Sequence, residues 1–144
     1  MTIKKLQLIS NSISYGPMPR PDKEVEQHLT INDRGQVWFS RYRFGDDMER
    51  HPLISKEYSR IPEEDANEIL KLSEAVINAK RVPDETDTGY WELTVTDADG
   101  EIRRKDGSLI YSDSKAIRDL CRRIRRSLKD WDLFLLDGYD RETL

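Results

Sequence analysis

The chain has 144 residues, of which 36% are hydrophobic and 36% are charged, and it carries a formal net charge of −4 at pH 7. A chain of this length is typical of one domain and can bury a core without staples. Twelve aromatic residues and the small net charge exclude an intrinsically disordered chain. The single cysteine excludes an internal disulfide and favours a reducing compartment.

No segment of the sequence is apolar enough to predict a signal peptide or a membrane span. The first residues mix lysines with few apolar side chains, and the longest apolar run covers only residues 133–136. A membrane-spanning helix needs about 20 apolar residues. The sequence therefore predicts a single cytoplasmic domain over residues 1–144 that has no membrane partner.

The N-terminal half predicts strands. Residues 3–15 alternate loosely and predict a first strand, which the prolines within residues 17–21 interrupt. Residues 25–32 and 36–44 predict a hairpin around a turn that ends at Gly35. A bulge at Gly35 would set Ile31 opposite Val37, with the apolar side chains of both strands on one face. Residues 53–61 predict a further strand.

The C-terminal half predicts two helices that enclose a second hairpin. A helix begins at Pro62, whose missing N–H suits the first helical position, and ends before Pro83. Residues 90–96 and 101–105 predict strands joined by a two-residue Asp99-Gly100 turn, with Ile102 on the inner face. Asp106-Gly107 then predicts a break.

A second helix follows, capped by Ser112 or Ser114, and residues 133–136 predict a short buried strand before frayed final residues. Strand runs interleaved with two amphipathic helices predict the α+β class. We expect a mainly antiparallel sheet of about five to seven strands with both helices on one face.

Three groups of segments carry a resemblance to known sequences. They are Gln27–Ile31 with Val37–Phe39, Asp87–Leu93 with Asp99-Gly100 and Gly107–Leu109, and Leu133–Gly138. Over most of the chain, they resemble a group of small uncharacterised bacterial proteins of unknown function, mostly from low-GC Gram-positive species. The resemblance implies a bacterial cytosolic domain and assigns no catalytic residue.

The sequence predicts no catalytic residue, metal ligand or cofactor. Cys121 falls on the apolar stripe of the second helix, where a thiol is expected to act as a small hydrophobe. The chain has two histidines and no paired cysteines, and glycine-rich phosphate loops are absent. Asp97-Ala98-Asp99-Gly100 is interpreted as a hairpin turn rather than a calcium loop. We therefore expect a protein that is not an enzyme.

Two surfaces are candidates for binding a partner. Residues 112–131 carry seven Lys or Arg and three Asp, and five cations step along one side of the second helix. These are Lys115, Arg118, Arg122, Arg125 and Lys129. The second surface is the strand face that carries Trp38, Tyr42 and Phe44, which lies away from the helices if they cover Leu29 and Val37.

These surfaces favour a non-enzymatic protein-interaction or regulatory module, of the immunity type, that binds a protein partner or itself. The alternative is a nucleic-acid-binding accessory protein that uses the basic stripe of the second helix. The nucleic-acid hypothesis is less favoured because such domains usually have a pI above about 9, whereas this chain has a pI near 5.3.

Overall fold

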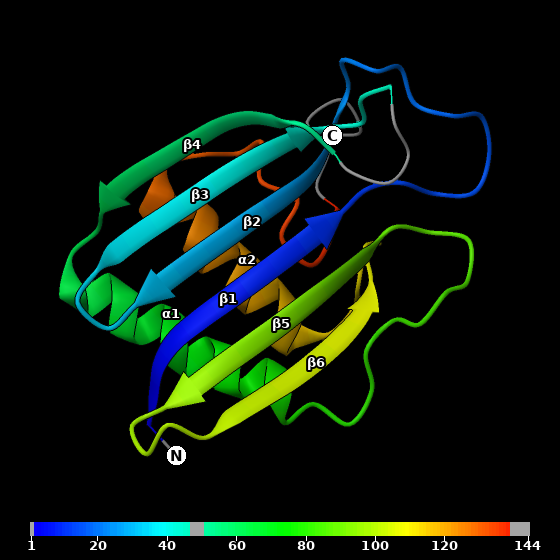
Figure 1. Cartoon of the computed structure of the whole chain (residues 1–144). Helices are drawn as coiled ribbons and strands as arrows, with labels where there is room; N and C mark the ends of the chain where they lie inside the picture. The colour runs from blue at the N-terminus through cyan, green and yellow to red at the C-terminus, as the bar shows by residue number, and fades with distance from the viewer. Residues whose placement is uncertain (1, 47–50, 139–144) are drawn as a thin grey trace.

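Within residues 2–46 and 51–138, which the computed structural model describes, the chain forms six strands and two helices (Figure 1). In chain order they are β1 (Ile3–Asn11), β2 (Glu24–Asn32), β3 (Gln36–Arg43), β4 (Leu53–Arg60), α1 (Glu63–Ile77), β5 (Tyr90–Asp97), β6 (Ile102–Ser108) and α2 (Lys115–Leu128). The α+β class predicted from the sequence is confirmed. The sequence also predicts a charged connection at residues 46–50. Its residues 47–50, and the final residues 139–144 that were expected to fray, lie outside the described residues.

All strand pairs in the sheet are antiparallel, and the strand order is β4-β3-β2-β1-β5-β6. Both helices lie behind the same face of the sheet (Figure 1). Alternate residues of the central strands point into the layer between sheet and helices, where Leu6, Leu29, Val37 and Leu93 are buried. The opposite face, which we call the open face, carries no helix among the described residues.

The first hairpin has the predicted register. Ile31 lies opposite Val37 and Leu29 opposite Phe39, and Gly35 has a φ of 81°. Gly35 also holds the start of α1, because its carbonyl accepts a 2.8 Å hydrogen bond from the Ile61 N–H. A Cβ at this glycine would lie 2.1 Å from the Ile61 oxygen, so the position has room for no side chain.

The second hairpin corrects the predicted turn. A two-residue turn would set Ile102 opposite Asp97 on the inner face. Ile102 instead lies opposite Thr96, so it faces the open side and is 59% exposed. Asp97 donates a 3.0 Å backbone hydrogen bond to the Glu101 carbonyl, so the loop that it closes consists of residues 98–100. The Asp97 carboxylate accepts hydrogen bonds from the N–H groups of Asp99 and Glu101, both at 2.9 Å. Only Gly100 of this loop has a positive φ, as in a type I turn followed by a bulge.

The break predicted at Asp106-Gly107 is absent, and β6 runs on to Ser108. Gly107 lies opposite Trp91, whose ring is fully buried. A Cβ on Gly107 would lie 2.6 Å from the Trp91 ring. The missing side chain of Gly107 therefore leaves room for the Trp91 ring on the inner face of the sheet, and the glycine does not end the strand.

Both helices form where the apolar stripes predicted them. α1 begins at Glu63, so Pro62 is the residue before the helix and not its first residue. Its buried Ser73 donates a 2.6 Å hydrogen bond to the Leu70 carbonyl, which satisfies the polar group in the stripe. In α2, the predicted cap Ser114 accepts a hydrogen bond from the Ile117 N–H.

The short strand predicted at residues 133–136 is wrong. Leu133, Leu135 and Leu136 are buried as expected, but residues 132–134 are irregular and residues 135–138 form a turn in which Leu135 has a φ of 48°. Polar side chains bind its backbone, in place of a neighbouring strand. The Ser10 hydroxyl, for example, donates a 2.6 Å hydrogen bond to the Leu135 carbonyl.

Candidate functional site

The open face carries an aromatic patch, which we define as His28, Trp38, Tyr42 and Tyr58, on the strands β2, β3 and β4. The rings of Trp38 and Tyr58 lie 5.5 Å apart, and those of His28 and Tyr42 lie 4.6 Å apart. Trp38 is 39% exposed and Tyr58 is 52% exposed. The structure thus places the predicted residues Trp38 and Tyr42 on the same face of the sheet, which the helices leave uncovered.

Phe44 does not belong to this patch, contrary to the prediction. It lies after the end of β3 and is only 6% exposed. The chain turns at Gly45, with a φ of 79°, and the Phe44 ring packs 5.8 Å from the ring of His51. The alternation that would have put Phe44 beside Tyr42 therefore stops at Arg43.

The proline-rich segment that precedes β2 leaves the aromatic patch open. Its last proline, Pro21, accepts a 2.9 Å hydrogen bond from the Gly45 N–H. The segment is thereby fixed at the end of β3, beyond the strand's last residue. Trp38, near the other end of β3, keeps its exposure.

One member of the patch, His28, is paired with the acidic side chain of Glu26. The His28 Nε2 atom lies 2.8 Å from a carboxylate oxygen of Glu26, and Asn11 donates a 3.0 Å hydrogen bond to the same carboxylate. The hydrogen bonds from His28 and Asn11 lower the pKa of Glu26 despite its partial burial. Among the described residues, no three His, Cys, Asp or Glu side chains are grouped to hold a metal ion. Glu26, which also lies opposite Tyr42, therefore places a negative charge at the edge of the patch.

The basic stripe of α2 is only partly as predicted. Lys115, Arg118 and Arg122 are exposed, as is Lys129 just after the helix. Arg125 is instead 4% exposed. Its guanidinium donates hydrogen bonds of 2.8 and 2.6 Å to the two carboxylate oxygens of Asp137, and one of 2.8 Å to the Leu133 carbonyl. This cation holds the C-terminal turn in place and is not available to a partner.

Within the stripe, Lys115 also has a partner in the same helix, because its ammonium lies 2.6 Å from the Asp119 carboxylate. This hydrogen bond lowers the pKa of Asp119. An exposed i, i+4 pair of this kind adds little to the stability of a helix because solvent screens it. Arg118, Arg122 and Lys129 therefore carry most of the outward positive charge of the stripe.

Cys121 lies in the core, as its place on the apolar stripe predicted. Its side chain is 1% exposed, and burial raises the pKa of the thiol to about 12. A thiol that stays protonated is neither a nucleophile nor a metal ligand.

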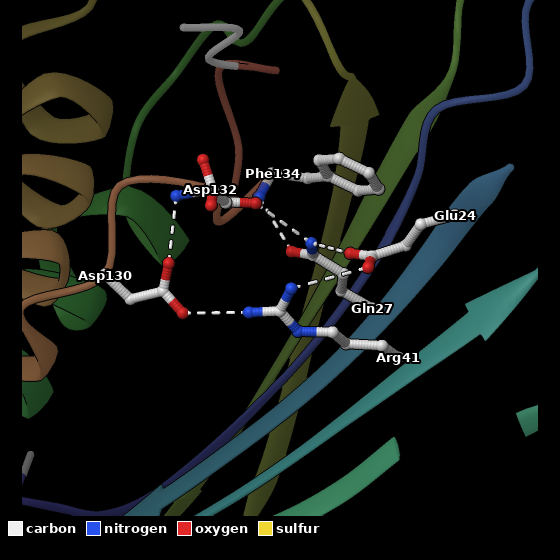
Figure 2. Close-up of polar contacts among 6 residues, drawn as sticks. All are labelled: Glu24, Gln27, Arg41, Asp130, Asp132 and Phe134. Atoms are coloured by element: carbon white, nitrogen blue, oxygen red, sulfur yellow. Dashed lines mark hydrogen bonds and ion pairs between the residues drawn. The ribbon is translucent and has the colours of Figure 1, made fainter. Parts of the chain in front are cut away.

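A polar cluster that was not predicted from the sequence holds the C-terminal segment against the helix side of the sheet (Figure 2). The side-chain amide of the buried Gln27 donates a 3.1 Å hydrogen bond to the Asp132 carbonyl and accepts a 2.7 Å hydrogen bond from the Phe134 N–H. Arg41 lies 3.0 Å from Asp130. The signal that could have revealed the cluster is Gln27 itself, a polar residue at an inward position between Val25 and Leu29.

No protein-family model matches this sequence, and a comparison with curated proteins finds no match. No helix among the described residues is long and apolar enough to cross a membrane.

The described part of the chain thus presents two candidate binding surfaces of distinct chemistry. One is the aromatic patch on the open face, and the other is the reduced basic stripe of α2.

Proposed function

We propose that this chain is a non-enzymatic protein-interaction module that contacts a protein partner through the aromatic patch on its open face. The observation that carries the proposal is the placement of both helices behind one face (Figure 1), which leaves Trp38, Tyr42 and Tyr58 together on the other. Aromatic side chains are enriched in protein interfaces because they bury much area at a low cost in entropy. Contiguous exposed patches of this kind mark interaction sites.

A regulatory or immunity-type role in a bacterial cytosol is the setting that we propose for this module. It follows from the resemblance to small bacterial proteins and from analogy with small acidic domains that act by surface complementarity. The buried Cys121 thiol and the use of Arg125 as a structural cation agree with a protein whose exposed surface, and not a reactive group, carries the function.

The test is affinity capture from a native bacterial lysate with the tagged full chain and three variants. Trp38→Ala and Tyr58→Ala remove the patch, whereas Trp131→Ala removes a tryptophan that is 46% exposed elsewhere. We expect one dominant protein with the wild type and with Trp131→Ala, and its loss with the patch variants, all of which keep the wild-type circular dichroism spectrum. Equal capture by all four proteins would contradict the proposal.

A second candidate function, nucleic-acid binding by α2, is supported by the outward positive charge of Arg118, Arg122 and Lys129. Binding through phosphate contacts weakens steeply as salt rises. An affinity for DNA or RNA that falls with salt and disappears in the variant Arg118→Glu/Arg122→Glu would favour this candidate. Absence of binding at low salt would remove it.

A further inference from the structure

The two edges of the sheet differ in how they are protected. In β6, the Lys105 ammonium bonds to the carbonyls of Ile77 and Ala79, and Arg103 donates a 3.0 Å hydrogen bond to Asn78, so the strand is fastened to the end of α1. In β4, seven of the eight residues are exposed and the other is half-buried. An edge strand presents unpaired backbone groups that can pair with another chain. The β4 edge is therefore open to an added strand.

The two faces of β4 have different chemistry. Lys56, Tyr58 and Arg60 lie opposite Ser40, Trp38 and Gln36, so they point to the open face beside the aromatic patch. On the helix side, β4 presents two serines and one acid, namely Ser55, Glu57 and Ser59. An incoming strand would thus meet a cation, an aromatic ring and a second cation in alternate positions on the open face.

A second copy of this chain is a poor occupant of the β4 edge. Two copies related by a two-fold axis would pair β4 with itself in antiparallel fashion, and residues on the same face must lie opposite each other. The two registers that centre on the strand place either Lys56 opposite Lys56 or Glu57 opposite Glu57. Like charges in directly opposed positions are destabilising.

We infer that β4 receives an extended segment of a different protein, which adds an antiparallel strand with an acidic, an apolar and an acidic residue opposite Arg60, Tyr58 and Lys56. The backbone ladder supplies affinity, and the alternate side chains supply specificity. The apolar residue would pack on Tyr58, whose ring already lies 5.5 Å from Trp38. This inference rests on the proposed function and names the class of its partner.

The test is an NMR titration of the ¹⁵N-labelled full chain with a capped peptide of sequence Thr-Glu-Thr-Val-Thr-Glu-Thr, added to millimolar concentration. We expect shift changes at the amides of residues 53–60 and at the Trp38 indole, with residues 102–108 of β6 unchanged. Lys56→Glu/Arg60→Glu should weaken binding about tenfold or more. The same peptide with Lys in place of Glu should bind this variant better than it binds the wild type.

Arg104→Glu is the matched control, because Arg104 lies on the open face of the opposite edge strand and should leave the affinity unchanged. Unchanged β4 amides, or equal binding of both peptides to the wild type, would overturn the inference. If lysate capture still depended on Trp38 in that case, the proposed function would stand without strand addition. If the peptide bound β4 but capture ignored Trp38, the proposed function alone would fail.

Discussion

Replacement of Arg125 by Met tests whether this residue of α2 is structural. Its side chain is 5% exposed, and its guanidinium forms a bidentate pair with Asp137 as well as a hydrogen bond to the Leu133 carbonyl. Methionine keeps much of the volume but leaves both acceptors without this donor. Removal of one partner of a buried ion pair costs about 3–5 kcal/mol. Because Asp137 is 19% exposed and can recruit water, we expect the lower end, about 3 kcal/mol.

Urea unfolding followed by far-UV circular dichroism measures this loss. A domain of this kind has a free energy of unfolding of about 5–15 kcal/mol, so the change is a large fraction of the total. With a slope of about 2 kcal/mol per molar urea, the midpoint should fall by about 1.5 M. Arg122→Met is the control, because Arg122 is exposed and should change the stability by no more than about 0.5 kcal/mol. A loss for Arg125→Met within 1 kcal/mol of that of Arg122→Met, roughly the spread of surface substitutions, would refute the reasoning.

Three further predictions concern the core and its polar supports. Gln27→Leu removes the partners of the Asp132 carbonyl and the Phe134 N–H, so it should cost about 1–3 kcal/mol and speed hydrogen exchange at the Phe134 amide. Gly107→Ala forces a methyl group against the Trp91 ring and should cost about 1–3 kcal/mol in the same urea assay, whereas wild-type stability would contradict the close approach. Because burial raises its pKa to about 12, Cys121 should resist iodoacetamide in the folded protein at pH 8 and react in urea; rapid labelling of the folded protein would contradict the burial.

Patterns within a short stretch of sequence were sufficient to predict the hairpin register and both helices. The β2–β3 pairing could be predicted because Gly35 fixes the turn and a one-residue slip would move every apolar side chain to the wrong face. The stripes of α1 and α2 have helical spacing, and Ser114 is a standard cap. Each of these signals lies within a few neighbouring residues.

What could not be predicted depends on contacts between distant parts of the chain. Arg125 has the same spacing as the exposed cations of α2. Its burial becomes evident only when the C-terminal turn, with its partner Asp137, is placed against the helix. Gln27 binds a segment more than one hundred residues away in the sequence, as its hydrogen bond to Asp132 shows. In the sequence, Gly107 is typical of a strand break, and only the contact with the buried Trp91 ring explains a glycine within β6.

The candidate site was half predictable for the same reason. Alternation along β3 placed Trp38 and Tyr42 on one face, but β4 supplies Tyr58, and the pairing of β3 with β4 cannot be found from either strand alone. The end of β3 at Arg43, which removes Phe44 from the face, depends on the turn at Gly45.

Hydroxyl-radical footprinting of the captured complex is the most direct test of the claim that the aromatic patch contacts a partner. Four exposed aromatic side chains serve as reporters in one experiment: Trp38 and Tyr58 in the patch, and Tyr111 and Trp131 outside it. We expect the partner to slow the oxidation of Trp38 and Tyr58 and to leave that of Tyr111 and Trp131 unchanged. Unchanged oxidation of Trp38 and Tyr58 in the complex would contradict the claim.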